Sequence, residues 1–113
     1  MSYYFNTQIF LGYELGKEIE DLATSGKISD EYLKDVLESG DIDYILDNMY
    51  GEFLYVGRSL SHKDEDDRAG ATELPCLNAA DYIELKEKLC KEPLLKDLIG
   101  DKMPKLYHVY YYG

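Results

Sequence analysis

Hydrophobic and polar residues alternate over the first fifteen positions of the chain. The odd positions from 3 to 15 are mostly apolar, whereas the even positions include Asn6, Gln8 and Glu14. A period of two is typical of a β-strand with one face on a core. By similar reasoning, two later segments are predicted to be strands: residues 52–61, whose two faces are both largely apolar or small, and residues 105–112, which follow Pro104.

Between the first two predicted strands, apolar residues recur at helical spacing in three segments. Ile19 and Leu22 indicate a first helix over residues 17–23. Ser29 can cap a second helix, which Gly40 can end. A third helix, capped by Asp41, is predicted over residues 42–48 from an inward-facing set: Ile42, Ile45, Leu46 and Met49.

The second half of the chain predicts a loop followed by two helices. Residues 62–74 are polar, acidic and contain glycine, which is typical of a loop. Asn78 can cap a helix over residues 79–91, and Pro93 can open a short helix over residues 94–99. The buried candidates of the longer helix are Ala79, Tyr82, Ile83, Leu85 and Leu89.

The predicted element order is β-ααα-β-αα-β. This order predicts a small α+β fold, in which helices pack on one face of a three-stranded antiparallel sheet. A length of 113 residues fits a single acidic domain over residues 1–113. We expect one shared core to contain residues from both kinds of element: Ile9, Leu33, Val36, Val56, Ile83, Leu89 and Val109.

The chain is strongly acidic, with 23 Asp and Glu against 12 Lys and Arg and a net charge of -11. Such a balance argues against direct binding to nucleic acid or to an anionic membrane, because both require cationic surface. No segment approaches the ~18 apolar residues of a membrane span, and the N-terminus lacks signal-peptide features. Cys76 and Cys90 lie too far apart along the predicted helix to form a disulfide. These features predict a cytoplasmic protein with free thiols.

The acidic excess is concentrated in one part of the chain. Residues 14–52 hold twelve acidic residues against three lysines, whereas residues 76–113 hold six of each sign. On the predicted second helix, Glu31, Asp35 and Glu38 follow at i, i+4 and i+7 and form one acidic stripe. Like charges at this spacing destabilise a helix by a few tenths of a kcal/mol each.

Two further acidic residues repeat this spacing in the predicted third helix, namely Asp43 and Asp47. The C-terminal helix differs, because Glu84 precedes Lys88 at the favourable i,i+4 spacing. One explanation of the acidic block is solubility alone. The other is a surface that binds a basic partner.

The chain contains 12 Tyr against 3 Phe and no Trp. Tyr44 and Tyr50 flank the acidic block, and the run Tyr110 to Tyr112 cannot be buried entirely because strand residues alternate between faces. Tyrosine suits half-buried strand positions, which is one explanation of its abundance. The alternative is recognition, since exposed tyrosines bind Arg- and Lys-rich surfaces.

No catalytic, metal or cofactor motif is predicted. The acidic run beside His62 lacks the glycine and the glutamate that a calcium loop requires at its sixth and twelfth positions. His108 lies on the last predicted strand, where a structural histidine is expected. No glycine-rich phosphate loop occurs either.

Two functions remain open from the sequence. The first is a non-enzymatic protein that binds a basic surface, such as that of a nucleic-acid-handling complex, and excludes nucleic acid by mimicking phosphate charge. In composition the chain resembles phage-encoded inhibitors such as anti-CRISPR and anti-restriction proteins, which would act in the host cytoplasm. The predicted contact residues are Glu31, Asp35, Glu38, Asp43 and Asp47, with Tyr44 and Tyr50 at the rim. The second is a small-molecule-binding protein or small enzyme, with a tyrosine-lined pocket between sheet and helices.

Overall fold

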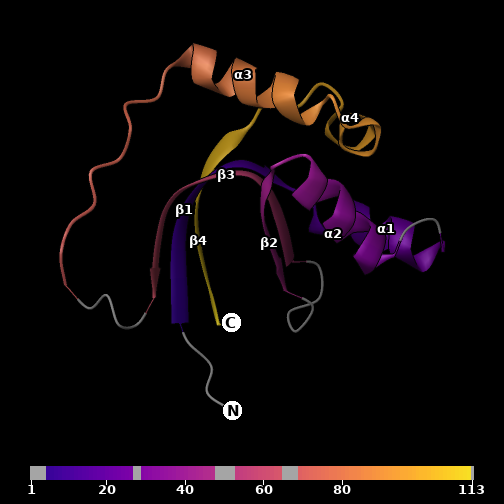
Figure 1. Ribbon diagram of the computed structural model, residues 1–113, viewed down its shortest axis with the longest axis horizontal. Coiled ribbons are helices and arrows are strands. Elements are labelled where there is room, and N and C mark those ends of the chain that lie inside the picture. Colours follow the sequence, from indigo (N-terminus) through magenta and orange to yellow (C-terminus); the bar gives the residue numbers. More distant parts are fainter. Residues whose placement is uncertain (1–4, 27–28, 48–52, 65–68, 113) are drawn as a thin grey trace.

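The computed structural model describes residues 5–26, 29–47, 53–64 and 69–112. In these residues the chain forms an α+β domain with four strands and four helices (Figure 1). In chain order they are β1 (Phe5–Glu14), α1 (Gly16–Thr24), α2 (Asp30–Ser39), β2 (Asp43–Asp47), β3 (Phe53–Asp64), α3 (Ala79–Leu89), α4 (Pro93–Ile99) and β4 (Lys105–Tyr112).

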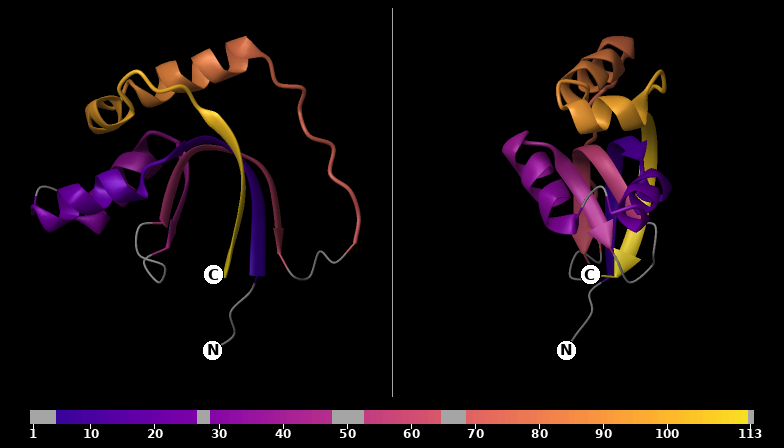
Figure 2. Two further views of the ribbon diagram at one scale, coloured as in Figure 1. Left: turned by 180° about the vertical axis from the view of Figure 1, so that it is seen from behind. Right: turned by 90° about the vertical axis from the view of Figure 1, so that its right-hand side faces the viewer.

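The strands form one antiparallel sheet in the order β2-β3-β1-β4. The register between β1 and β3 shifts at Ile9 and Phe10, which oppose Ser61 and Ser59 and leave Leu60 as the extra residue of a bulge. Both strands bend strongly, so that the sheet forms an arch (Figure 1). The helices lie on the outer, convex side of the arch, and its concave side carries no helix (Figures 1 and 2).

The structure corrects the predicted number of strands and the element order. Residues 43–47 form the edge strand β2 instead of the predicted third helix, so the order is β-αα-ββ-αα-β. Asp43 pairs with Gly57, and Asp47 pairs with Phe53. The spacing of Ile42, Ile45 and Leu46 fits a helix, but backbone pairing with the edge of β3 determines the state of this short segment.

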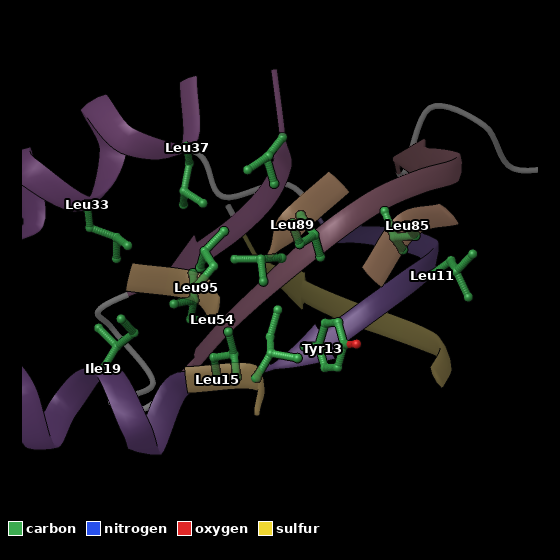
Figure 3. Close-up of a cluster of buried hydrophobic side chains, with 13 residues drawn as sticks. Leu11, Tyr13, Leu15, Ile19, Leu33, Leu37, Leu54, Leu85, Leu89 and Leu95 are labelled. Atoms are coloured by element: carbon green, nitrogen blue, oxygen red, sulfur yellow. The ribbon is translucent and has the colours of Figure 1, made fainter. Parts of the chain in front are cut away.

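The main hydrophobic core lies between the sheet and all of the helices (Figure 3). Each of α1 to α4 contributes buried residues, for example Ile19, Leu33, Leu89 and Leu95. They pack on side chains that alternate along β1 and β3 and share one face of the sheet, and on Leu15 directly after β1: Leu11, Tyr13, Leu15, Leu54 and Val56.

A second, smaller core lies on the concave face. Phe10, Ile45 and Val109 are buried there, and Tyr55, Tyr107 and Tyr111 pack around them. The expectation of a single shared core was therefore wrong for Val109, which lies on the opposite face of the sheet from Leu33 and Val56.

Three of the predicted core residues are not fully buried, and one of them is Val36, which is half-buried on α2. Ile83 is 48% exposed, because the buried side of α3 carries Leu85 and Leu89 and Ile83 lies on the other side of the helix. Ile9 is only partly buried, in a groove at the far end of the sheet. Leu33, Val56 and Leu89 are fully buried, as predicted.

Local capping chemistry determines several element boundaries. The Ser29 hydroxyl accepts a hydrogen bond from the backbone N–H of Tyr32 at the start of α2. Asn78 and Asp81 form a capping box at the start of α3. β3 extends to Asp64, so the strand includes the first residues of the predicted loop, and residues 69–78 have no regular secondary structure. Among the described helices, none is long and apolar enough to cross a membrane.

Candidate functional site

The exposed side of α2 carries the acidic stripe. Leu33 and Leu37 are fully buried and attach the helix to the core. Glu31, Asp35 and Glu38 are exposed, and at 100° per residue they project from the opposite side. Within the described part of the chain, no lysine or arginine forms an ion pair with these three carboxylates. The stripe is therefore exposed to solvent, and its carboxylates form no ion pair with any described residue.

Helix α1 adds further acidic residues at the same end of the molecule (Figure 1). Glu20 and Asp21 are exposed on α1. Glu18 differs, because its Oε1 lies 3.3 Å from the Lys102 Nζ and forms an ion pair with it. That ion pair joins α1 to the segment before β4. Glu18 therefore contributes to the fold and is not part of the acidic stripe on α2.

Tyr44 connects the stripe to the sheet. Its hydroxyl donates a hydrogen bond of 2.9 Å to Oε1 of Glu38. This hydrogen bond, together with partial burial, raises the pKa of the Tyr44 phenol above its ordinary value. Tyr44 therefore remains a neutral hydrogen-bond donor that orients Glu38. It contacts the acidic stripe directly, whereas the sequence placed it at the rim.

The structure separates Asp43 from the stripe. Successive strand residues point to opposite faces, so Asp43 lies on the face opposite to that of Tyr44. Its Oδ2 accepts a hydrogen bond of 2.9 Å from the backbone N–H of Ser59. The β2–β3 ladder ends at the pair of Asp43 and Gly57, and Ser59 lies two residues beyond it. The Asp43 carboxylate therefore replaces the backbone acceptor that a longer β2 would have offered to the Ser59 N–H.

The helical i,i+4 relationship predicted for Asp43 and Asp47 is therefore wrong, since both residues belong to a strand. Asp47 pairs with Phe53 through the backbone at the far end of β2. Tyr50, the second predicted rim residue, lies outside the described residues. Of the predicted set, the structure brings together Glu31, Asp35, Glu38 and Tyr44.

Three of the described strand tyrosines, Tyr55, Tyr107 and Tyr111, have structural roles on the concave face. The rings of Tyr55 and Tyr107 meet edge to face, with centroids 5.2 Å apart. Burial is the main cause of the raised pKa of Tyr55. The Tyr111 hydroxyl accepts a hydrogen bond of 2.7 Å from Nε2 of Gln8. The Oε1 atom of Gln8 in turn accepts a hydrogen bond of 2.7 Å from the Ser59 hydroxyl.

This polar row across β4, β1 and β3 was missed at the level of sequence. Gln8 and Asn6 occupy even positions that indicated a solvent face, yet each is only 9% exposed. The Asn6 Oδ1 lies 2.9 Å from Nε2 of His62 in a further cross-strand hydrogen bond. The tyrosine run of the last strand could have indicated this burial, because large side chains on a neighbouring strand shield polar residues of β1 from solvent.

Two grooves lie beside the sheet, and neither is lined by tyrosine; a third groove, of about 420 Å³ beside Gly40 and Lys91, is not lined by tyrosine either. One, of about 300 Å³, lies between the far end of the sheet, including Ile9 and Lys63, and residues 69–74. The other, of about 260 Å³, lies beside α3 and includes Arg58 and Lys88. The space between sheet and helices is filled by the main core, and Tyr55, Tyr107 and Tyr111 lie on the other face.

No group of three or more His, Cys, Asp or Glu in the described ranges is arranged to hold a metal ion. Cys76 is exposed and Cys90 is half-buried, and both are free thiols. Comparison of the chain with protein-family models, with curated proteins and with solved structures gave no significant match. The exposed face of α2 is therefore a candidate site on the basis of its own geometry and charge.

Proposed function

We propose that this protein is a non-enzymatic, acidic binding protein that uses the exposed face of α2 to contact a basic surface on another protein. The observation that carries the proposal is the state of Glu31, Asp35 and Glu38, which are exposed and form no ion pair within the described residues. A helix whose glutamates are each followed by a lysine would serve solubility equally well, and the sequence of α3 has this pattern, with lysines four residues after Glu84 and Glu87.

The architecture supports a preorganised contact surface. Carboxylates three or four residues apart on a helix lie ~5–6 Å from one another, comparable to neighbouring phosphates of a nucleic-acid strand. Leu33 and Leu37 attach the helix to the core, and Tyr44 holds Glu38 in position. The stripe can therefore occupy a cationic groove that normally binds nucleic acid, and its charge would accelerate association through long-range steering.

The partner is a protein with a cationic groove, such as a nucleic-acid-handling complex, and inhibition follows from competition with DNA or RNA. The composition, similar to that of phage-encoded inhibitors, is compatible with this role. In that case the protein acts in the host cytoplasm. Direct binding of this chain to nucleic acid is not expected, because its net charge is -11.

The test compares two variants with the same change in net charge. Glu31→Lys/Asp35→Lys reverses the stripe, and Glu84→Lys/Glu87→Lys reverses two exposed acidic residues of α3. Glu38 is left unchanged because it binds Tyr44, and Asp81 because it belongs to the capping box of α3. Each tagged protein is used to capture partners from a lysate of the source or host cells, with identification by mass spectrometry.

We expect wild type and the α3 variant to retain a nucleic-acid-binding protein that the α2 variant loses. A DNA or RNA oligonucleotide should displace that partner, and higher salt should weaken the complex over a Debye length of ~8–10 Å. If the α2 variant keeps all partners, or if no captured protein is displaced by nucleic acid, the proposed function is incorrect.

A further inference from the structure

The two edges of the sheet differ in length and charge. The strand order leaves β2 and β4 at the edges. β2 has five residues with an aspartate at each end, which is a common way to prevent edge-to-edge pairing. β4 has eight residues, and its only charged residue is Lys105 at the first position. A long, uncharged edge strand is a ready template for another strand.

The outer edge of β4 is open in the described structure. β4 packs against β1 as its neighbour in the sheet. Seen from behind, it is the nearest strand, and no helix passes in front of it (Figure 2, left). On its convex face Leu106 is 50% exposed and Tyr110 is 65% exposed, with the exposed His108 between them.

The charge distribution favours a second copy of this chain at the β4 edge. Much of the acidic excess of residues 14–52 belongs to α2 and to β2, which contact each other, and β2 is the opposite edge strand of the sheet. Residues 76–113, which include β4, carry equal numbers of acidic and basic residues. Two copies can therefore meet at β4 while the acidic residues of α2 and β2 in each copy lie away from the junction.

We propose that two copies associate through β4, which pairs antiparallel with β4 of the partner subunit around a two-fold axis at His108. The two four-stranded sheets then become one continuous sheet. This register places Leu106 opposite the partner's Tyr110, and Tyr110 opposite the partner's Leu106. The two most exposed apolar side chains of β4 thereby cover each other on the same face of the joined sheet.

The same register also suits the concave face. Tyr107 lies opposite the partner's Val109, so the small core on that face continues across the junction. Apolar and aromatic cross-strand pairs each contribute roughly 0.2–1 kcal/mol beyond the backbone hydrogen bonds. The acidic faces of the two α2 helices remain at the outer ends of the dimer, so this inference does not depend on the proposed function.

The oligomeric state of the full chain by sedimentation equilibrium tests the inference, with two matched variants. Leu106→Lys/Tyr110→Lys places like charges opposite each other twice across the axis, whereas Leu106→Lys/Tyr110→Glu places opposite charges there. Both change the same exposed side chains. We expect wild type to dimerise, the first variant to raise the dissociation constant at least about tenfold, and the second to lie much closer to wild type.

A monomeric wild type at high micromolar concentration would overturn the proposal, as would a dimer that neither variant weakens. Equal weakening by both variants would overturn the two-fold register at His108. Circular dichroism of each variant verifies that the domain remains folded, since both residues lie on the surface.

Cross-linking tests the axis directly. In a Cys76→Ser/Cys90→Ser background, His108→Cys places two thiols opposite each other, with Cα atoms ~4.5–5.5 Å apart. That separation allows a disulfide. Tyr110→Cys is the control, because four residues along an antiparallel pair separate the two positions by ~14 Å. Oxidation should cross-link the first variant and not the second; the reverse result, or no cross-link in either, would overturn the inference.

Discussion

Gly12 of β1 lies directly opposite Gly57 of β3, where the two backbones approach too closely for a side chain. A Cβ on Gly12 would lie 2.0 Å from the carbonyl oxygen of Val56, and one on Gly57 would lie 2.2 Å from that of Leu11. Gly57 also has a φ of 151°, which L-residues rarely adopt. A facing glycine pair permits the strong bend of both strands (Figure 1).

Gly12→Ala should therefore destabilise the domain by more than about 2 kcal/mol, because the methyl group meets backbone that cannot rotate away. Gly26→Ala is the control, since Gly26 has a positive φ of 75° but its added methyl group would meet no atom within 4 Å. Its cost should be about 1–2 kcal/mol from the backbone alone. Urea unfolding measures both, and an equal loss in the two variants would contradict close packing at Gly12.

The two sides of α3 should respond differently to truncation. Leu89 is fully buried and Ile83 is 48% exposed. Leu89→Ala should lower the free energy of unfolding by about 2–5 kcal/mol, through lost burial and the cavity left behind. Ile83→Ala should change it by less than about 0.5 kcal/mol. Chemical denaturation of both variants checks the orientation of the helix, which would be wrong if Ile83→Ala were the more damaging change.

Asp43 should matter for stability more than for partner binding. Asp43→Ala removes the acceptor of the Ser59 N–H and should cost about 1–2 kcal/mol. Asp43→Asn keeps a carbonyl oxygen at that position and should recover part of the loss. Thermal unfolding ranks the three proteins, and equal stability of Ala and Asn variants would show that the hydrogen bond contributes little.

Tyr13 should make stability fall at high pH. Burial raises the pKa of Tyr13 from 10.0 to about 12, with a smaller contribution from Cys90. The folded state favours the neutral phenol, which donates a hydrogen bond of 2.8 Å to the Lys102 carbonyl. The stabilisation is complete below pH 10 and is lost as the pH rises from about 10 to about 12.

A Tyr13→Phe variant isolates this effect from the titration of lysines. The variant should be less stable than wild type by about 1 kcal/mol at pH 7, because it lacks the hydrogen bond. The difference should shrink as the pH rises above 10 and reverse as the pH approaches 12, since a shift of two pKa units corresponds to roughly 2–3 kcal/mol. Denaturation at several pH values measures it, and a difference independent of pH would contradict the burial of the phenol.

Local sequence determined much of the secondary structure. Ser29 and Asn78 mark the starts of α2 and α3 because their side chains cap backbone N–H groups a few residues away. Pro93 marks the start of α4 for a similarly local reason. The exposure of Glu31 and Asp35 also followed from the sequence, because 3.6-residue periodicity places them opposite Leu33.

Only the tertiary structure decided the state of residues 43–47 and the division of the core. In a segment of five residues, Ile45 and Leu46 satisfy a helix and a strand equally well, and pairing with β3 some ten residues later settles the choice. The same pairing makes Tyr44 a partner of Glu38 and Asp43 a partner of Ser59. Such contacts depend on which backbones lie side by side, and strand periodicity alone contains no information about the neighbour or about which sheet face the helices cover.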